Sequence, residues 1–270
     1  MTDVTQAGAT NSQPAAAPEP ILEARAIDKT YGHVEALRGA NFSAYAGEVV
    51  ALVGDNGAGK STLIKILSGV AQPDSGQILF EGRPVHVSSP SAAQRLGIET
   101  VYQDLALAPD LDGAANIYLG REPVRSGVLG KLGVLDKRAM REQTSRTFTD
   151  LGVGIRDPSA AVAYLSGGQR QGVAVARAAV WASKVIIMDE PTAALGVVQS
   201  ERVLDVVRRV RDRGLAVILV SHNMPQVLSV ADRIQVLRLG RRVATFGRDE
   251  ATLESLVAAM TGALEQEDER

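Results

Sequence analysis

The sequence predicts an α/β fold built on a parallel β-sheet. Two short apolar runs, at 185–188 and 216–220, have the composition of strands that are covered on both faces. Strand-like segments alternate with helix-like segments along most of the chain, as in parallel sheets. With 270 residues, 45% of them hydrophobic, the chain can form one large domain or one core with an inserted subdomain.

The individual elements follow from periodicity and turn residues. A first strand is expected to end at Gly32, and two more strands flank a turn at Ala46–Gly47. A glycine-rich stretch leads into a helix over Ser61–Gly69, and a hairpin turns at Glu81–Gly82. The later elements are a short helix and a strand within 90–102, helices at 168–182 and 198–213, strands at 184–190 and 215–222, a strand pair at 233–247 after a short helix, and a final helix at 249–260.

Three segments depart from this alternation. Residues 1–20 are rich in Ala, Pro, Thr and Gln and are predicted to form a disordered tail. Residues from about 104 to 180 are more polar, helix-prone and interrupted by Gly and Pro, which predicts an inserted α-helical subdomain. Residues 264–270 form an acidic C-terminal tail, so the main domain is expected over 21–263.

Composition excludes several classes of function. The formal net charge of −2 lacks the basic excess of a typical nucleic-acid binder. Cysteine is absent, which excludes disulfides, thiolate metal sites and cysteine nucleophiles. The N-terminus lacks the basic start and apolar core of a secretory signal, and no apolar run is long enough to span a bilayer. Any link to a membrane is therefore expected to go through a partner.

The segment from Gly54 to Ser61 matches the pattern G-x-x-x-x-G-K-[ST]. Its glycines allow successive backbone N–H groups to surround phosphate oxygens, and the positive end of the next helix points at the same oxygens. The alternative is a plain glycine turn that caps a helix, but a strand before and a helix after favour phosphate binding. The residues predicted to bind a nucleoside triphosphate are Gly54, Asp55, Asn56, Gly57, Ala58, Gly59, Lys60, Ser61 and Thr62.

Two acidic residues end the strand at 184–190. Asp189 is positioned to hold the hydration shell of Mg²⁺ opposite the phosphate-binding loop. Glu190 follows and, by strand alternation, is expected to point elsewhere, where a carboxylate can polarise a water for attack on the γ-phosphate. The alternative is an ordinary charge pair at a strand end.

A second glycine stretch begins at Ser166, which resembles an N-cap with Gln169 completing a capping box. Two interpretations are open: the stretch is this cap alone, or it is a second phosphate-binding helix start.

With these motifs the chain resembles the nucleotide-binding subunit of an ATP-binding-cassette (ABC) transporter. Residues 165–169, "LSGGQ", match the signature of that family, and the resemblance extends from about residue 21 to 260. It implies a P-loop NTPase (RecA-like) core with an antiparallel β subdomain and an inserted α-helical subdomain. It also implies that Tyr31 stacks on adenine, that Gln103 senses Mg²⁺ and the γ-phosphate, and that Lys60, Glu190 and His222 are catalytic.

The resemblance further implies ATP and Mg²⁺ as cofactors, with the cation held by Ser61, Gln103 and Asp189. Two cassettes are expected to face head to tail, so that one cassette's signature contacts the ATP held by its partner's phosphate-binding loop. The signature residues are Leu165, Ser166, Gly167, Gly168 and Gln169.

One segment departs from the family pattern. The D-loop commonly reads S-A-L-D, whereas here it is Ala193, Ala194, Leu195 and Gly196. The departure puts communication between the two ATP sites in doubt, but the acids and His222 remain, so hydrolysis is still expected.

Residues 101–123 and 190–197 are similar to the ribose, xylose and fructose branch of sugar importers, in which the same glycine recurs. The single cassette resembles the fructose-type members, which implies a homodimer on the cytoplasmic face of the inner membrane. An integral-membrane permease and a periplasmic or extracellular sugar-binding protein are the expected partners, with no nucleic acid.

Three alternatives to a sugar importer stay open. They are a soluble ABC ATPase of DNA repair or translation, an importer of a non-sugar solute, and a non-catalytic nucleotide-gated scaffold.

Overall fold

The computed structural model describes residues 19–155, 157–193 and 195–264. Most of the predicted N-terminal tail and all but the first residue of the predicted acidic tail lie outside these ranges, as does Ala194 of the D-loop. Within them, none of the helices combines the length and the apolar run needed to cross a bilayer.

The core is a six-stranded sheet with the order β10-β9-β3-β8-β7-β6. The pairs between β3, β6, β7, β8 and β9 are parallel, and β10 is antiparallel to β9, which confirms the predicted parallel sheet. The strands are β3 (Val49–Val53), β6 (Ile98–Val101), β7 (Val185–Asp189), β8 (Ala216–Val220), β9 (Arg233–Arg238) and β10 (Arg241–Gly247).

Both faces of this sheet are buried, as its apolar runs predicted. Successive residues of β7 face opposite sides, so Ile187 packs with α1 and the second sheet, whereas Ile186 packs with α6 and α7. Val53 belongs to a further cluster with α8 and α9.

The helices are α1 (Lys60–Leu67), α2 (Pro90–Arg95), α3 (Gly113–Tyr118), α4 (Val128–Lys131), α5 (Lys137–Leu151), α6 (Gly167–Trp181), α7 (Val197–Asp212), α8 (Met224–Val230) and α9 (Leu253–Thr261), with a 3₁₀ turn at Val162–Tyr164.

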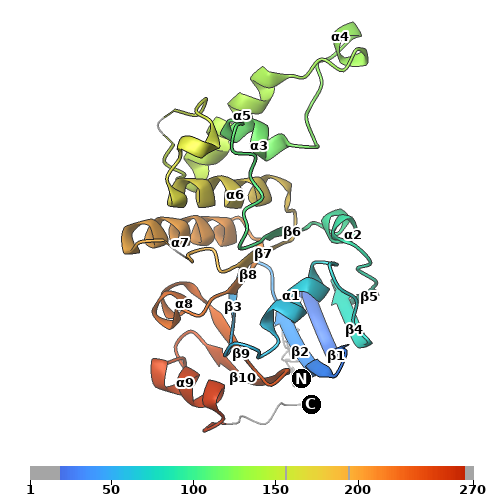
Figure 1. The fold of residues 1–270 in the computed structure, drawn as a ribbon, viewed down its shortest axis with the longest axis vertical. Coiled ribbons are helices and arrows are strands. Elements are labelled where there is room, and N and C mark those ends of the chain that lie inside the picture. The colour runs from blue at the N-terminus through green and yellow to red at the C-terminus, as the bar shows by residue number, and fades with distance from the viewer. Residues whose placement is uncertain (1–18, 156, 194, 265–270) are drawn as a thin grey trace, which may run out of the picture.

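A second sheet is antiparallel, with the order β2-β1-β4-β5. The predicted hairpin turn at Glu81–Gly82 is present, with Phe80 paired to Arg83 across it. This sheet packs beside α1, as Figure 1 shows, and borders the end of the glycine-rich loop, where Gly59 lies close to Ala36 of β2. Its strands are β1 (Leu22–Tyr31), β2 (Val34–Ala44), β4 (Ser75–Phe80) and β5 (Arg83–Val85).

Between β6 and β7 the chain forms helices α3, α4, α5 and α6, which lie toward one end of the molecule's long axis (Figure 1). The limits of about 104 and 180 for a helical subdomain stay a prediction. The final helix was expected from residue 249 but begins at Leu253. The side chain of Thr252 accepts a hydrogen bond from Ser255 N and forms a capping box, so the chain becomes helical only after it.

Candidate functional site

Register across the large sheet brings the predicted motifs to one edge. Val220 pairs with Leu52 on one side and with Asp189 on the other, and Met188 pairs with Val101. The carboxyl ends of β3, β8, β7 and β6 therefore share an edge, where open α/β sheets bind ligands. The glycine-rich loop, His222, the two acids and Gln103 follow these strands in that order.

The glycine-rich loop depends on glycine for space as well as conformation. Gly54 has φ 150°, and a Cβ there would lie 2.2 Å from the carbonyl oxygen of Leu237 on β9. Gly59 has φ 104°, and its Cβ would lie 2.6 Å from the carbonyl oxygen of Ala36 on β2. The loop is thus pressed against both sheets, with its backbone close to its neighbours.

Lys60 is the first residue of α1 and is 9% exposed. Its Nζ donates hydrogen bonds to the carbonyl oxygens of Gly54, at 2.6 Å, and of Asp55, at 3.0 Å. Burial lowers the pKa of this ammonium, while Glu190, Asp55 and Asp189 act in the opposite direction. A partly desolvated cation is thereby held against the carbonyl oxygens of the loop.

The next two hydroxyls and the predicted adenine contact border the same loop. Ser61 is exposed on the first turn of α1, and Thr62 is half-buried. Tyr31 is exposed at the end of β1 and pairs with Val34 of β2, two residues before Ala36, whose carbonyl oxygen borders Gly59. The β1–β2 hairpin therefore brings an exposed aromatic ring to the side of the glycine-rich loop.

The two acids at the end of β7 differ in conformation. Asp189 ends the strand, and burial together with the neighbouring Glu190 raises the pKa of its carboxyl, while Lys60 and Lys65 act in the opposite direction. Glu190 has φ 51°, and its N–H donates to the carbonyl oxygen of Val220 at 2.9 Å. Glu190 lies beyond the end of β7 in a left-handed turn, so the strand alternation used in the sequence analysis does not extend to it. A non-glycine residue in this conformation is strained, and such strain often marks functional sites.

His222 lies just beyond β8 and faces Glu190. Its Nδ1 is 3.0 Å from Oε1 of Glu190, and its side chain is 67% exposed, against 25% for that of Glu190. When Nδ1 carries a proton it donates to the carboxylate, which leaves Nε2 for another partner. The pair combines a proton acceptor with an exposed imidazole at the sheet edge.

Gln103 is exposed after β6 and lines a hollow of about 450 Å³. Gly167 at the start of α6 and Leu195 in the loop after Glu190 line the same hollow. The structure thus joins the loop that holds Gln103 to the predicted signature and to the D-loop segment.

Arg177 on α6 is a residue that the sequence analysis missed. Its guanidinium donates to the carbonyl oxygens of Leu105, at 2.7 Å, and Ala106, at 2.9 Å, just after Gln103. Burial lowers the pKa of Arg177, while Glu99 acts in the opposite direction. Since its partners are backbone atoms about 70 positions earlier, no local pattern signals this contact.

The predicted signature forms the start of α6. Ser166 and Gln169 make the expected capping box, with Ser166 N donating to Gln169 Oε1 at 2.9 Å. Gln169 Nε2 also donates to the carbonyl oxygen of Gly154 at 2.9 Å. Leu165 precedes this turn, while Gly167 and Gly168 pack against Leu195 and Gln199. The side-chain hydrogen bonds of Ser166 and Gln169 with described residues therefore stay within the helical region, apart from the glycine-rich loop.

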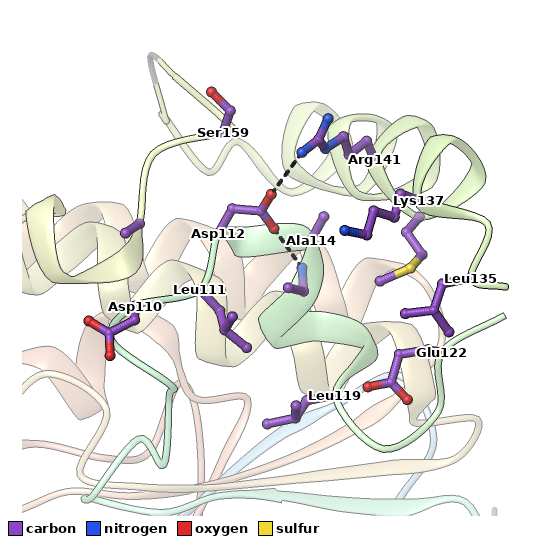
Figure 2. A pocket seen from close by; sticks show the side chains of 13 residues that line it. Asp110, Leu111, Asp112, Ala114, Leu119, Glu122, Leu135, Lys137, Arg141 and Ser159 are labelled. Atoms are coloured by element: carbon purple, nitrogen blue, oxygen red, sulfur yellow. Dashed lines mark hydrogen bonds and ion pairs between the residues drawn. The ribbon is translucent and has the colours of Figure 1, made fainter. Parts of the chain in front are cut away.

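A separate pocket of about 440 Å³ lies among the helices (Figure 2). Asp112 borders it, accepting from the backbone N–H of Ala115 at 2.7 Å and pairing with Arg141 at 3.5 Å. The lining mixes charged and apolar side chains, among them Asp110, Glu122, Lys137, Leu111, Leu119, Leu135 and Met140.

Chemically, the sheet edge combines what phosphoryl transfer to water requires. The loop and Lys60 provide donors for phosphate oxygens, Asp189 provides a carboxylate, and the Glu190–His222 pair provides a proton acceptor.

Comparison with known proteins shows the family of the chain. A family model described as "ABC transporter" matches residues 37–193. The chain is 54% identical to the fructose import ATP-binding protein FrcA of Rhizobium meliloti, over 92% of this chain and 96% of the relative. The chain belongs to the ABC transporter family. As an ABC-family ATPase, the cassette binds ATP and hydrolyses it.

Further relatives carry related names. The cassette is 48% identical to the xylose/arabinose import ATP-binding protein XylG of Sulfolobus acidocaldarius, over 89% of this chain and 94% of the relative. It is 44% identical to the ribose import ATP-binding protein RbsA 1 of Rubrobacter xylanophilus, but spans only 47% of that longer protein. These homologues are sugar-import ATP-binding subunits.

Solved structures agree on the fold. A nucleotide-free ATP-binding cassette from an ABC transporter superposes with a TM-score of 0.77 at 25% identity, covering 89% of this chain and 96% of that one. The protein cbiO1 of Clostridium perfringens gives a TM-score of 0.73 at 27% identity, covering 90% of this chain and 95% of that one. Together with the glycine-rich loop, they confirm the predicted P-loop NTPase fold.

Proposed function

We propose that the cassette is the ATPase subunit of an importer for a monosaccharide of the fructose, ribose or xylose type. The names of these relatives support the substrate class, with fructose import at 54% identity. The cassette matches FrcA along nearly the full length of both chains. It therefore resembles the fructose-type relative in length as well as in sequence.

The observation that carries the mechanism is the 3.0 Å contact between Glu190 Oε1 and His222 Nδ1. In the proposed reaction, Glu190 accepts the proton of the water that attacks the γ-phosphate. His222 orients this carboxylate through Nδ1 and contacts the γ-phosphate through its other nitrogen. Lys60 exchanges its carbonyl partners in the loop for β- and γ-phosphate oxygens, and the N–H groups of the 54–59 loop surround the same phosphates.

The residues at this edge fit Mg²⁺. Ser61, Gln103 and Asp189 supply hydroxyl, amide and carboxylate oxygens, the hard ligands that this cation takes together with phosphates. Burial and the neighbouring Glu190 raise the pKa of Asp189, which means that its ionised form is disfavoured. A cation bound nearby would stabilise this ionised form. When bound, Mg²⁺ would neutralise charge that develops on the phosphates. Tyr31 is proposed to stack on the adenine, and Thr62 to donate to a phosphate.

A second copy of the chain is proposed to complete each ATP site. The first turn of α6 exposes Ser166 and holds its own N-cap through Gln169, yet its contacts lie apart from the loop of the same chain. A head-to-tail homodimer would let Leu165, Ser166, Gly167, Gly168 and Gln169 of one copy close over the triphosphate held by the other.

The permease is proposed to dock in the pocket bordered by Asp112 and Arg141 (Figure 2). This pocket lies among the helices that follow the Gln103 loop, so a movement of that loop can reach it through α3. The complete system is proposed to include an external sugar-binding protein, with the cassette peripheral on the cytoplasmic face of the inner membrane.

The test is reconstitution of the cassette in liposomes with a sugar permease and its binding protein, measuring uptake of labelled fructose, xylose and ribose. ATP-dependent uptake of one of these sugars, lost in Glu190→Gln, is the expected result. Uptake of a non-sugar solute alone would show that the substrate is not a monosaccharide. Steady ATP hydrolysis without any association with the permease would favour a soluble ABC ATPase.

A further inference from the structure

An exposed apolar segment lies at the far end of the helical region. We call residues 124–135 the apolar tip. Figure 1 shows its helix, α4, projecting at one end of the molecule's long axis, with no other element around it. Every residue of the tip except Gly130 is exposed. Its apolar members are Val124, Val128, Leu129, Leu132, Val134 and Leu135.

The tip is ordered by its backbone. Val124 and Leu135 form an antiparallel bridge, and Arg125 N donates to the carbonyl oxygen of Val134 at 2.9 Å. At Gly130 the chain passes so close to the carbonyl oxygen of Arg125 that a Cβ would lie 1.7 Å from it. Backbone therefore fills the inside of the tip, and its apolar side chains face outward.

Such exposure at one place indicates a partner, because soluble proteins rarely leave contiguous apolar side chains uncovered. Val128 and Leu132, one helical turn apart, are 74% and 73% exposed. Leu129 lies about 100° around α4 from Val128, and Val134 lies on the returning segment. The apolar side chains thus surround the tip instead of forming one face, which suits a fluid environment better than a protein groove of fixed shape.

The charge of the tip agrees with a lipid surface. Positions 123–135 contain Arg125 and Lys131 but no Asp or Glu. Glu122 and Asp136 flank this stretch, and Lys137 and Arg138 follow, so residues 122–138 carry four basic and two acidic side chains. Arg125, Lys131 and Lys137 make no ion pair with another described residue. Segments that combine apolar side chains with free cations bind the headgroup region of anionic membranes.

We infer that the apolar tip inserts its side chains into the headgroup region of an anionic lipid bilayer. The inference deepens the proposed function and rests on it, since that function brings the cassette to a membrane. Leu135 belongs both to the tip and to the pocket proposed for the permease, so lipid contact and permease contact would adjoin.

The test is co-sedimentation of the full chain, without permease, with vesicles of phosphatidylcholine alone or mixed with phosphatidylglycerol. The wild type is expected to bind the anionic vesicles more, and less at high salt. Val128→Ser with Leu132→Ser should lower binding on the order of tenfold. Val197→Ser with Val198→Ser, which changes exposed valines at the start of α7, is the matched control and should bind like the wild type.

ATPase rates of the same variants distinguish a failure of the proposed function from a failure of the lipid contact. The tip variant should hydrolyse ATP like the wild type. If neither protein hydrolyses ATP, the result counts against the proposed function and not against the lipid contact. Wild-type protein that ignores anionic vesicles, or a tip variant that binds them fully, would overturn the lipid contact. A second arm repeats the assay with vesicles that contain the permease, and a tip variant that loses binding only there would also overturn the lipid contact, because the partner would then be protein.

Discussion

The carboxylate of Glu190, after β7, lies 3.0 Å from Nδ1 of His222, after β8. The two residues are 32 positions apart in the chain and meet because β7 and β8 pair in parallel with Asp189 opposite Val220. The backbone bond from Glu190 N to the carbonyl oxygen of Val220 holds the same junction. Strand register, and not a local motif, therefore builds the proposed base and the group that orients it.

Glu190→Gln should abolish turnover while preserving nucleotide binding. The amide keeps the size of the side chain but cannot accept a proton, so kcat should fall by about 10² to 10⁴-fold. Phosphate release measures the rate, and equilibrium binding of labelled ATP measures affinity. Light scattering with Mg²⁺ and ATP should detect a trapped dimer, whereas Lys60→Ala should lose ATP affinity. Unchanged turnover in both variants would refute the assigned roles.

The glycines of the loop allow a controlled comparison. Gly57 and Gly59 both have positive φ, but a Cβ meets open space at Gly57 and the Ala36 carbonyl oxygen, at 2.6 Å, at Gly59. Gly57→Ala should cost roughly 1–2 kcal/mol of unfolding free energy, from conformation alone. Gly59→Ala adds a clash with β2 and should destabilise more. Urea unfolding measures both, and equal losses would show that the close approach to β2 is unimportant.

The sequence predicted the parts of the site whose signals are local. The loop from Gly54 to Ser61, the acids after β7 and the capping box at Ser166 each lie within a few consecutive residues, so their chemistry could be recognised before their positions were known. The apolar runs of β7 and β8 likewise predicted a sheet buried on both faces.

The remainder depends on contacts between distant segments. The left-handed conformation of Glu190 arises at the turn after β7, which strand alternation cannot anticipate. Arg177 reads as an ordinary helical arginine until α6 packs against the loop after β6. The exposure of the apolar tip is also invisible in the sequence, because Val128 and Leu132 have the spacing of a buried helix face.

Arg177 is expected to be a positioning residue for the Gln103 loop. Its two hydrogen bonds hold the carbonyl oxygens of Leu105 and Ala106, so Arg177→Ala should leave these acceptors unpaired and the loop less ordered. Turnover should fall about tenfold with little change in ATP affinity. Arg177→Lys should restore part of the rate, since an ammonium can still donate to these carbonyl oxygens but lacks the planar fork of the guanidinium.

The control for this prediction is Arg146→Ala, which changes an exposed arginine on α5. Its kcat and KM should match the wild type. Equal losses of kcat and of ATP affinity in Arg177→Ala, together with a lowered unfolding temperature, would assign Arg177 a structural role only.

The antiparallel sheet should weaken in acid because of Asp28 and Asp74. Asp28 accepts from Ser75 Oγ at 2.5 Å and from Gly39 N at 2.6 Å, and these bonds lower its pKa. Asp74 accepts from Lys29 Nζ at 2.6 Å and from Thr30 N at 2.7 Å, with the same effect on its pKa. Both groups bind protons less readily in the folded protein than in the unfolded chain. Their stabilisation is thus complete above the unfolded value of 3.8 and is lost as the pH falls below it.

Urea unfolding measured from pH 6 down to pH 3 tests this linkage. Asp74→Asn should be less stable than the wild type at pH 6, and the difference between the two proteins should shrink as the pH falls below about 4, where Asp74 of the unfolded chain takes up a proton that the folded protein binds less readily. Asp110→Asn provides the control, because Asp110 is exposed and makes no side-chain hydrogen bond or ion pair with described residues. That variant should follow the wild type at every pH. A constant difference between Asp74→Asn and the wild type across the range would show that the contact with Lys29 and Thr30 does not depend on the charge of Asp74.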